Sequence, residues 1–170
     1  MKLNEELEAK FNAQITLEFE ASLVYRQLAI EMDLADLPGM ASWLRRQADE
    51  EIVHANKFID HLDARGNHPR IGDISTGHLT ISQDPRETFK TALEHEKRVS
   101  ESIRDLYRAC AKADDLDSNP LLNWFLAEQI EEEATVDEIL GRLEHTGDDG
   151  PGLLRLDDEL AGRPNTGTED

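Results

Sequence analysis

Four acidic side chains fall at positions where a helix would normally bury hydrophobic ones. In the stretch QADEEIVHA, residues 47–55, Glu51 lies on the same helical face as Leu44, Ala48 and Ala55. Three other long amphipathic segments, read at the same alternating spacing of three and four, each carry a carboxylate near the middle of an apolar face. The four inward carboxylates are Glu18, Glu51, Glu96 and Glu132.

These carboxylates need a compensating positive charge. Unpaired ionised groups are costly in a core of low dielectric constant, and Lys and Arg are absent from the four faces. A single inward glutamate is explained equally well as a hydrogen-bonded core residue. Four at matching depth favour bound metal ions, because a purely structural acidic bundle would leave all four unexplained.

Glu51 and His54 are three residues apart, so their side chains lie on adjacent helical turns and can reach one ion together. A lone Glu-x-x-His is common by chance, but among the other inward glutamates it becomes specific. Oxygen-rich ligation with one imidazole suits iron or manganese and disfavours a structural zinc site.

Other polar and aromatic residues are assigned to surface or packing roles. Glu94 lies two residues from Glu96 and should point away from the core, and Trp43 and Trp124 are expected to pack. We expect the remaining histidines to be surface residues rather than ligands: His61, His68, His78, His95 and His145.

The elements that would position these residues are four long helices, predicted at about 4–35, 39–65, 84–113 and 119–145. Asp84 is a candidate N-cap followed by a proline at the first helical position. The non-helical residues 67–85 are expected to cross the length of a bundle. A short fifth helix should follow DDGPG, and residues 163–170 are predicted to form a flexible tail.

Composition narrows the class of protein. The length of 170 residues predicts one domain over residues 1–162, and few glycines and prolines favour an all-α fold. A net charge of −19 argues against nucleic-acid binding and fits solubility, a salty cytoplasm or cation attraction. No apolar run approaches the ~18 residues that span a membrane. The single cysteine, Cys110, and the absence of a secretory signal indicate a reducing cytoplasm.

The stretches QADEEIVHA, ALEHEKRV and NWFLAEQIEEE make the sequence resemble the non-haem bacterial ferritins over nearly its whole length. The resemblance implies a ferritin-like up-down-down-up four-helix bundle with a long crossover loop and a short fifth helix. It further implies a homo-oligomeric shell of 24 subunits that oxidises Fe(II) with O2 or H2O2 and stores Fe(III) mineral.

The resemblance also assigns residues to a di-iron ferroxidase centre. The first iron site would contain Glu18, Glu51, His54 and Glu96. Glu51 and Glu96 would reach the second iron, Gln129 and Glu132 would complete the centre, and Tyr25 would lie beside it. A third, outer iron site would contain Glu50, Glu128 and Glu131.

Two alternatives are weighed against this interpretation. Haem-containing bacterioferritins carry a second Glu-x-x-His where this chain has Gln129 and Glu132, and a haem-binding Met where it has Ile52. We therefore expect no haem. Another di-iron carboxylate oxidase, acting on an organic substrate, would need an apolar pocket beside the metals. The inward-facing sides of the four long helices, which we call their seams, show no cluster of small residues that would form one.

The start of the fourth helix departs from the pattern of animal ferritins. Asn119 and Leu122 stand where the entry carboxylates of those proteins lie, so the threefold route is in doubt. We interpret Asp114, Asp115 and Asp117 as a solvated acidic turn rather than a replacement for those carboxylates.

Overall fold

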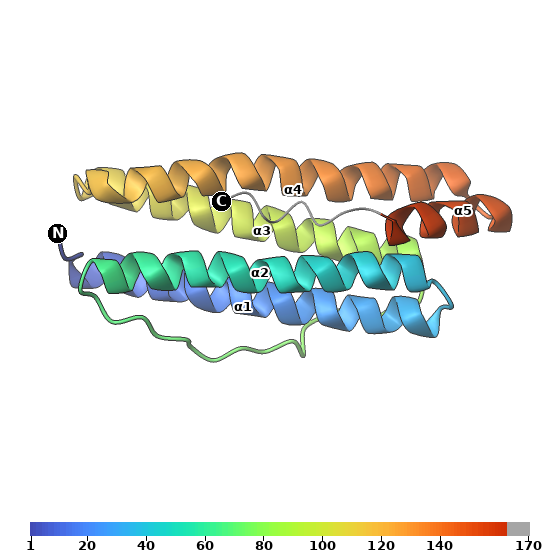
Figure 1. The fold of residues 1–170 in the computed structure, drawn as a ribbon, viewed down its shortest axis with the longest axis horizontal. Helices are drawn as coiled ribbons and strands as arrows, with labels where there is room; N and C mark the ends of the chain where they lie inside the picture. Colours follow the sequence, from blue (N-terminus) through green and yellow to red (C-terminus); the bar gives the residue numbers. More distant parts are fainter. Residues whose placement is uncertain (163–170) are drawn as a thin grey trace.

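The computed structural model describes residues 1–162 and consists of five α-helices and one short 3-10 helix (Figure 1). The long helices are α1 (Glu5–Leu34), α2 (Pro38–Ala64), α3 (Pro85–Lys112) and α4 (Asn119–Thr146). The short ones are η1 (Leu116–Ser118) and α5 (Gly150–Ala161). The predicted all-α, up-down-down-up bundle is confirmed, whereas η1 was not expected. The predicted flexible tail lies outside the described residues.

The helix ends follow the capping chemistry of the sequence. The Asn4 side chain accepts a hydrogen bond from the backbone N–H of Leu7, and the predicted N-cap Asp84 accepts one from that of Arg86. Asp36 and Asp114 adopt left-handed backbone conformations, with φ of 58° and 56°, just beyond the ends of α1 and α3. These residues reverse the chain with very short connections.

The crossover segment, residues 65–84, runs along α1 from one end of the bundle to the other (Figure 1). Asn12 Oδ1 accepts a hydrogen bond from the backbone N–H of Arg70, at 2.7 Å. One turn further along α1, Thr16 Oγ1 accepts one from Gly72, at 2.8 Å. Polar side chains of α1 therefore hold the segment in place.

The α3–α4 turn is held by a buried ion pair. Both guanidinium Nη atoms of Arg65 donate to Asp115, at 2.8 and 2.6 Å, and Nη1 also donates to Ser118. This arrangement lowers the pKa of Asp115, mainly through the hydrogen bond from Arg65. Asp115 is thus a structural partner of α2, while Asp114 and Asp117 are exposed as the solvated turn predicts.

Helix α5 closes one end of the bundle by capping α2. The N-cap residue of α2, Leu37, has no capping side chain. Instead, buried Asp157 of α5 accepts hydrogen bonds from the backbone N–H groups of Gly39 and Met40, at 3.0 and 2.7 Å. A Cβ at Gly39 would lie 1.9 Å from the Asp157 carbonyl oxygen, so only glycine permits this contact.

The hydrophobic core is divided into two clusters, and each long helix contributes to both. One cluster contains residues from the ranges 7–17 of α1, 58–62 of α2, 99–110 of α3 and 122–125 of α4. The other contains residues from the ranges 24–32 of α1, 40–48 of α2, 89–93 of α3 and 136–143 of α4. The interval between the clusters holds the inward carboxylates of all four helices. The fold therefore places a polar layer across the middle of an apolar bundle.

Candidate metal centre

The polar layer is shielded from solvent. Glu18 is fully buried, Glu51 and Glu96 are 1% exposed, and Glu132 is 6% exposed. His54, Gln129 and Tyr25 are buried in the same layer. Glu94 is exposed, as its position off the α3 seam predicts. The helical register inferred from the sequence is therefore confirmed in all four helices.

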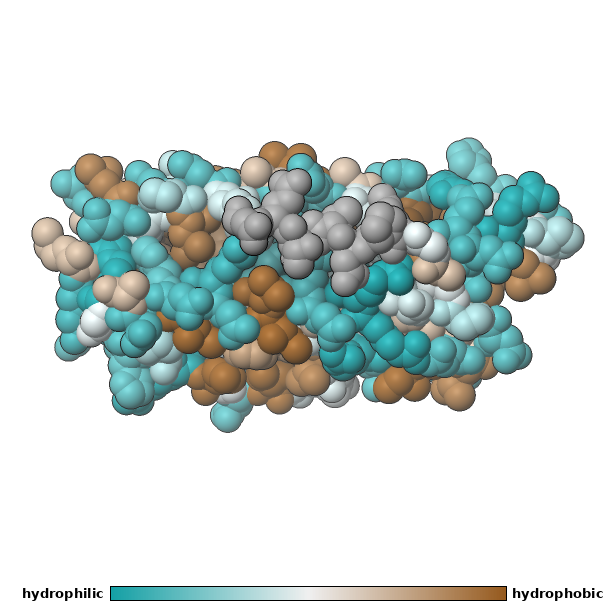
Figure 2. Space-filling view, viewed as in Figure 1, coloured by the Kyte–Doolittle hydropathy of each residue, from teal (hydrophilic) through white to brown (hydrophobic). Residues whose placement is uncertain are grey.

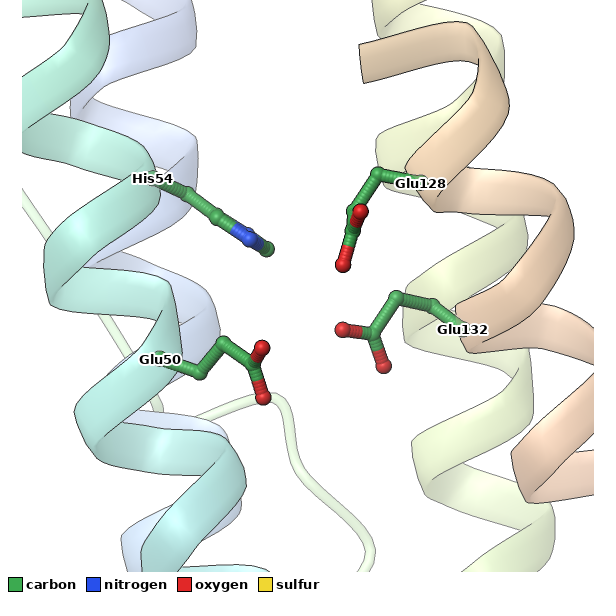
Figure 3. Close-up of side chains that lie close together, drawn as sticks. All are labelled: Glu50, His54, Glu128 and Glu132. Atoms are coloured by element: carbon green, nitrogen blue, oxygen red, sulfur yellow. The ribbon is translucent and has the colours of Figure 1, made fainter. Parts of the chain in front are cut away.

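Two groups of side chains bring their ligand atoms within 4.8 Å of one another. Glu18 of α1 meets Glu51 and His54 of α2 in the first group. The second joins Glu50 and His54 of α2 to Glu128 and Glu132 of α4, and Figure 3 shows these four side chains pointing toward a common centre. His54 belongs to both groups, so it connects a buried site with a partly exposed one.

Glu96 is tied into the layer by hydrogen bonds. Tyr25 Oη donates to Glu96 Oε1, and Gln129 Nε2 donates to Glu96 Oε2 at 3.1 Å. These bonds hold the α3 carboxylate against α1 and α4. Glu131 is exposed and belongs to neither group, whereas Glu50 and Glu128, assigned with it to an outer site, are half-buried beside His54.

Two glutamines that received no role from the sequence position candidate ligand carboxylates. Gln47 Nε2 donates to Glu132 Oε2 at 2.8 Å, across the bundle from α2 to α4. Gln14 Nε2 donates to Glu18 Oε1 at 2.7 Å, and the Gln14 amide is itself oriented by Ser102 Oγ, which donates to its Oε1 at 2.6 Å. Gln14 lies one turn before Glu18 on the same face of α1, so its inward position was visible in the sequence, whereas its contact with Ser102 depends on the packing of α1 on α3.

The layer favours protonated carboxyl groups unless a cation is bound. Burial raises the pKa of Glu18, Glu51 and Glu132 well above the usual range, and neighbouring carboxylates raise them further. Burial also raises the pKa of Glu96. Within residues 1–162, no Lys or Arg forms an ion pair with any of these four carboxylates.

In the described part of the chain, one oxygen of the Glu18 carboxylate has no partner. Glu18 Oε2 is buried and accepts no hydrogen bond from residues 1–162, although its companion Oε1 is bonded to Gln14. Such orphaned buried oxygens are rare in proteins. An oxygen-rich donor set with one imidazole and an unsatisfied carboxylate oxygen fits iron-type cations, so the residues present fit the metal that the sequence predicts.

Of the two tryptophans that were expected to pack in the core, one does so only in part. Trp43 is buried at 3% exposure, as predicted for a packing residue. Trp124 is 38% exposed; its ring lies edge-on to His54 with centroids 5.6 Å apart, and Lys57 Nζ lies 4.5 Å from its centroid. Trp124 thus covers the outer side of His54 and only partly packs into the core.

The Gln14 contact gives a first testable prediction. Replacing Gln14 with Leu removes the donor that orients Glu18, and the loss of such a supporting bond weakens metal binding by about 10- to 100-fold. The measurement is a titration of the metal-free protein with Co2+. Gln27→Leu is the matched control, because Gln27 Nε2 donates to Glu31 Oε1 at 2.8 Å on the same helix. Equal Co2+ affinity in the Gln14 and Gln27 variants would show that the bond does not orient the ligand.

Comparisons with known proteins agree with this architecture. Residues 8–146 match the family model for the Ferritin-like domain. The chain is 33% identical over 159 residues to a bacterial non-heme ferritin of Escherichia coli, covering 94% of this chain and 96% of the relative. It is 34% identical to one from Staphylococcus epidermidis, covering 95% and 96%. The structure of an open-pore ferritin from the archaeon Archaeoglobus fulgidus superposes with a TM-score of 0.92 at 31% identity, covering 96% of this chain and all of that one.

Proposed function

The chain belongs to the ferritin family, and on that premise we propose that it stores iron, oxidising Fe(II) at the buried carboxylate layer and retaining Fe(III) mineral inside a 24-subunit shell. The observation that carries the proposal is the set of four buried carboxylates, one from each long helix, that no Lys or Arg among the described residues neutralises. Iron is the substrate and the cargo of this site.

Each residue of the layer has a proposed role. Glu18, Glu51, His54 and Glu96 bind the first Fe(II), and Glu51 and Glu96 reach a second one, with Gln129 and Glu132 completing the centre. Anionic oxygen ligands stabilise Fe(III) relative to Fe(II), which makes oxidation favourable. Each Fe(II) loses one electron, and O2 or H2O2 accepts electrons in pairs, so two ions held together match the oxidant. Because Gln129 is a neutral donor, we expect the second ion to leave more readily.

Glu50 and Glu128 form the basis of an outer site. Their carboxylates converge with His54 and Glu132, and burial raises the pKa of Glu50. The shared His54 and Glu132 connect this group to the inner ligands. We propose that it passes ions between the centre and the cavity, and that exposed Glu131 is reached only after a change of rotamer.

The haem-containing alternative is disfavoured. The bacterial relatives carry the name non-heme ferritin, and Ile52 follows Glu51 where bacterioferritins have their haem-binding methionine. Particle mass distinguishes a storage protein from a di-iron oxidase that acts on an organic substrate, because only storage requires a closed shell.

Apolar side chains on the outside of the subunit support self-association. Leu23, Ile30 and Leu34 share one face of α1 and are 45–61% exposed, and Ile71 and Ile81 of the crossover segment are 58% and 59% exposed. Figure 2 shows hydrophobic side chains gathered along the lower edge of the molecule, where α1 and the crossover segment run in Figure 1. Surfaces of this kind on a highly charged protein mark contact sites between copies.

The proposal places the protein in the cytoplasm, without nucleic-acid or membrane partners. Within residues 1–162 no helix combines the length and apolarity needed to cross a bilayer. The charge of −19 opposes contact with nucleic acids, and the buried thiol of Cys110 suits a reducing compartment.

The test is aerobic addition of Fe(II) to the metal-free protein, followed by size-exclusion chromatography with elemental analysis. We expect rapid oxidation and co-elution of many iron atoms per subunit with a particle of shell mass. Oxidation by a particle of one or two subunits, with the iron precipitating outside it, would exclude storage. A large particle that retains iron without oxidising it rapidly would exclude the ferroxidase role.

A further inference from the structure

A separate cluster of side chains of types that can bind metal lies where α1, α3 and the crossover segment meet. It contains Glu20 of α1, His95 of α3 and His78 of the crossover segment, with Arg98 at its edge. Glu20 and His95 each lie within two residues of a ligand of the carboxylate layer, but neither belongs to the two groups described above. These residues therefore lie outside the carboxylate layer.

His95 is the residue whose environment demands an explanation. The sequence predicted it to be a surface residue, and this prediction was wrong, because His95 is 6% exposed. Both ring nitrogens are buried and have no hydrogen-bond partner among residues 1–162. A neutral imidazole has one N–H donor and one lone pair, and leaving such groups unpaired in the interior destabilises the folded state. A ligand for the lone pair would remove part of this cost.

Two imidazoles converge on one carboxylate oxygen. His95 Nε2 lies 3.7 Å and His78 Nε2 lies 3.8 Å from Glu20 Oε1. These distances are too long for hydrogen bonds. Zinc bonds to imidazole nitrogen and carboxylate oxygen are about 2.0 to 2.2 Å, which places neighbouring ligand atoms about 3.3 Å apart in a tetrahedral site. The two separations from Glu20 exceed that value by only a few tenths of an ångström. The ligand atoms of His78 and His95 lie more than 4.8 Å apart, so one of the two rings has to move before both can reach the same ion.

His78, the third candidate ligand, can move toward the other two. The His78 side chain is 54% exposed on a non-helical segment, so its ring can approach the ion without disturbing a helix. His95 and Glu20, in contrast, are fixed by burial on adjacent helices.

We propose that Glu20, His78 and His95 form a site for a borderline divalent transition-metal ion such as Zn2+, separate from the carboxylate layer. Two imidazoles and one carboxylate are an established zinc ligand set that leaves a fourth position for water. The donor set differs from the oxygen-rich layer, so the two sites would select different metals. The ion would join the crossover segment to α1 and α3.

Arg98 competes with the ion for Glu20. Its Nη1 donates to Glu20 Oε1 at 2.6 Å, while the Arg98 side chain is 54% exposed. The guanidinium reaches a largely buried Glu20 from the solvent side, so a divalent ion bound to Glu20 can displace it into solvent. Removing Arg98 should therefore strengthen metal binding. If the cluster had a purely structural role, removing Arg98 would not increase the affinity for the metal ion.

The experiment is a Zn2+ titration of the metal-free protein by calorimetry, with bound zinc counted after gel filtration. We expect His78→Gln and His95→Gln each to bind one zinc ion fewer per chain than the original protein. Arg98→Gln should bind that ion about tenfold more tightly, because a nearby positive charge is removed. His68→Gln is the control, since His68 is an exposed histidine of the same segment, and it should change nothing.

The outcomes are independent of the proposed ferroxidase function. Glu51→Gln, which alters the carboxylate layer, should retain the ion bound by His78 and His95. Equal zinc content in the original protein and His78→Gln would overturn the proposal, as would weaker binding in Arg98→Gln. His78 and Arg98 are exposed, so these two variants decide the matter even where His95→Gln folds poorly.

Discussion

Replacing Glu51 with Ala is expected to slow the initial oxidation of Fe(II) by more than about hundredfold while leaving the particle mass unchanged. Loss of a group that merely supports a metal ligand costs about 10- to 100-fold, and Glu51 is itself a proposed ligand of both ions. The side chain is 1% exposed inside the bundle, so it does not contribute to contacts between subunits. Stopped-flow absorbance after aerobic Fe(II) addition measures the rate, and native mass measures assembly.

Glu94→Ala is the matched control for this loss. It also removes one glutamate, two residues from Glu96, but its side chain is exposed. We expect its oxidation rate to stay within about twofold of the original. A Glu51→Ala protein that no longer assembles, or one that oxidises iron as fast as Glu94→Ala, would remove Glu51 from the centre.

Replacing Glu18, Glu51 and Glu96 together with Gln is expected to abolish rapid oxidation and to stabilise the metal-free protein at alkaline pH. Gln keeps the shape of each side chain and removes the buried charge. Replacing buried charges by neutral groups stabilises proteins by about 1 to 4 kcal/mol, or several degrees in Tm. Added metal should raise the Tm of the original protein and leave that of the triple variant unchanged.

The pH dependence follows from the direction of the pKa shifts. Folding raises the pKa of all three carboxyl groups above the value of 4.5 that they have in water. The folded state therefore binds more protons than the unfolded state, and the free energy of unfolding falls as pH rises from about 4.5 through the raised values. The advantage of the triple variant should thus be largest near pH 8 and disappear near pH 4.

An equal change of charge at the surface provides the comparison. Glu94, Glu138 and Glu144 are exposed, so replacing these three with Gln should leave the pH dependence of Tm close to that of the original protein. If instead the buried triple variant melts well below the metal-free original at pH 8, the inward glutamates stabilise the fold themselves, and the reason for assigning them to metal is lost.

The sequence predicted the fold and the inward position of the four carboxylates because both depend on helical periodicity. The spacing of apolar residues defined one face on each helix, and the interruption of that face marked Glu18, Glu51, Glu96 and Glu132. Local chemistry likewise predicted the N-cap at Asp84. Such features are encoded within a few turns of one segment.

Contacts between segments were not visible in the same way. His95 was placed on the surface because it lies off the α3 seam, yet the packing of α1 and the crossover segment buries it. The bonds from Gln47 to Glu132 and from Ser102 to Gln14 join different helices. Each depends on the relative rotation and height of two helices, which periodicity within one helix does not determine.

The dependence of α2 on Asp157 has a consequence for how the chain is made. The amide groups of Gly39 and Met40 leave the ribosome long before their partner, which is 118 residues further along the chain from Gly39. At a translation rate of about 5 to 20 residues per second, Asp157 is synthesised about 6 to 24 seconds after the start of α2 that it caps. A chain that ends before residue 157 lacks this cap. Completion of synthesis is therefore linked to completion of one end of the bundle.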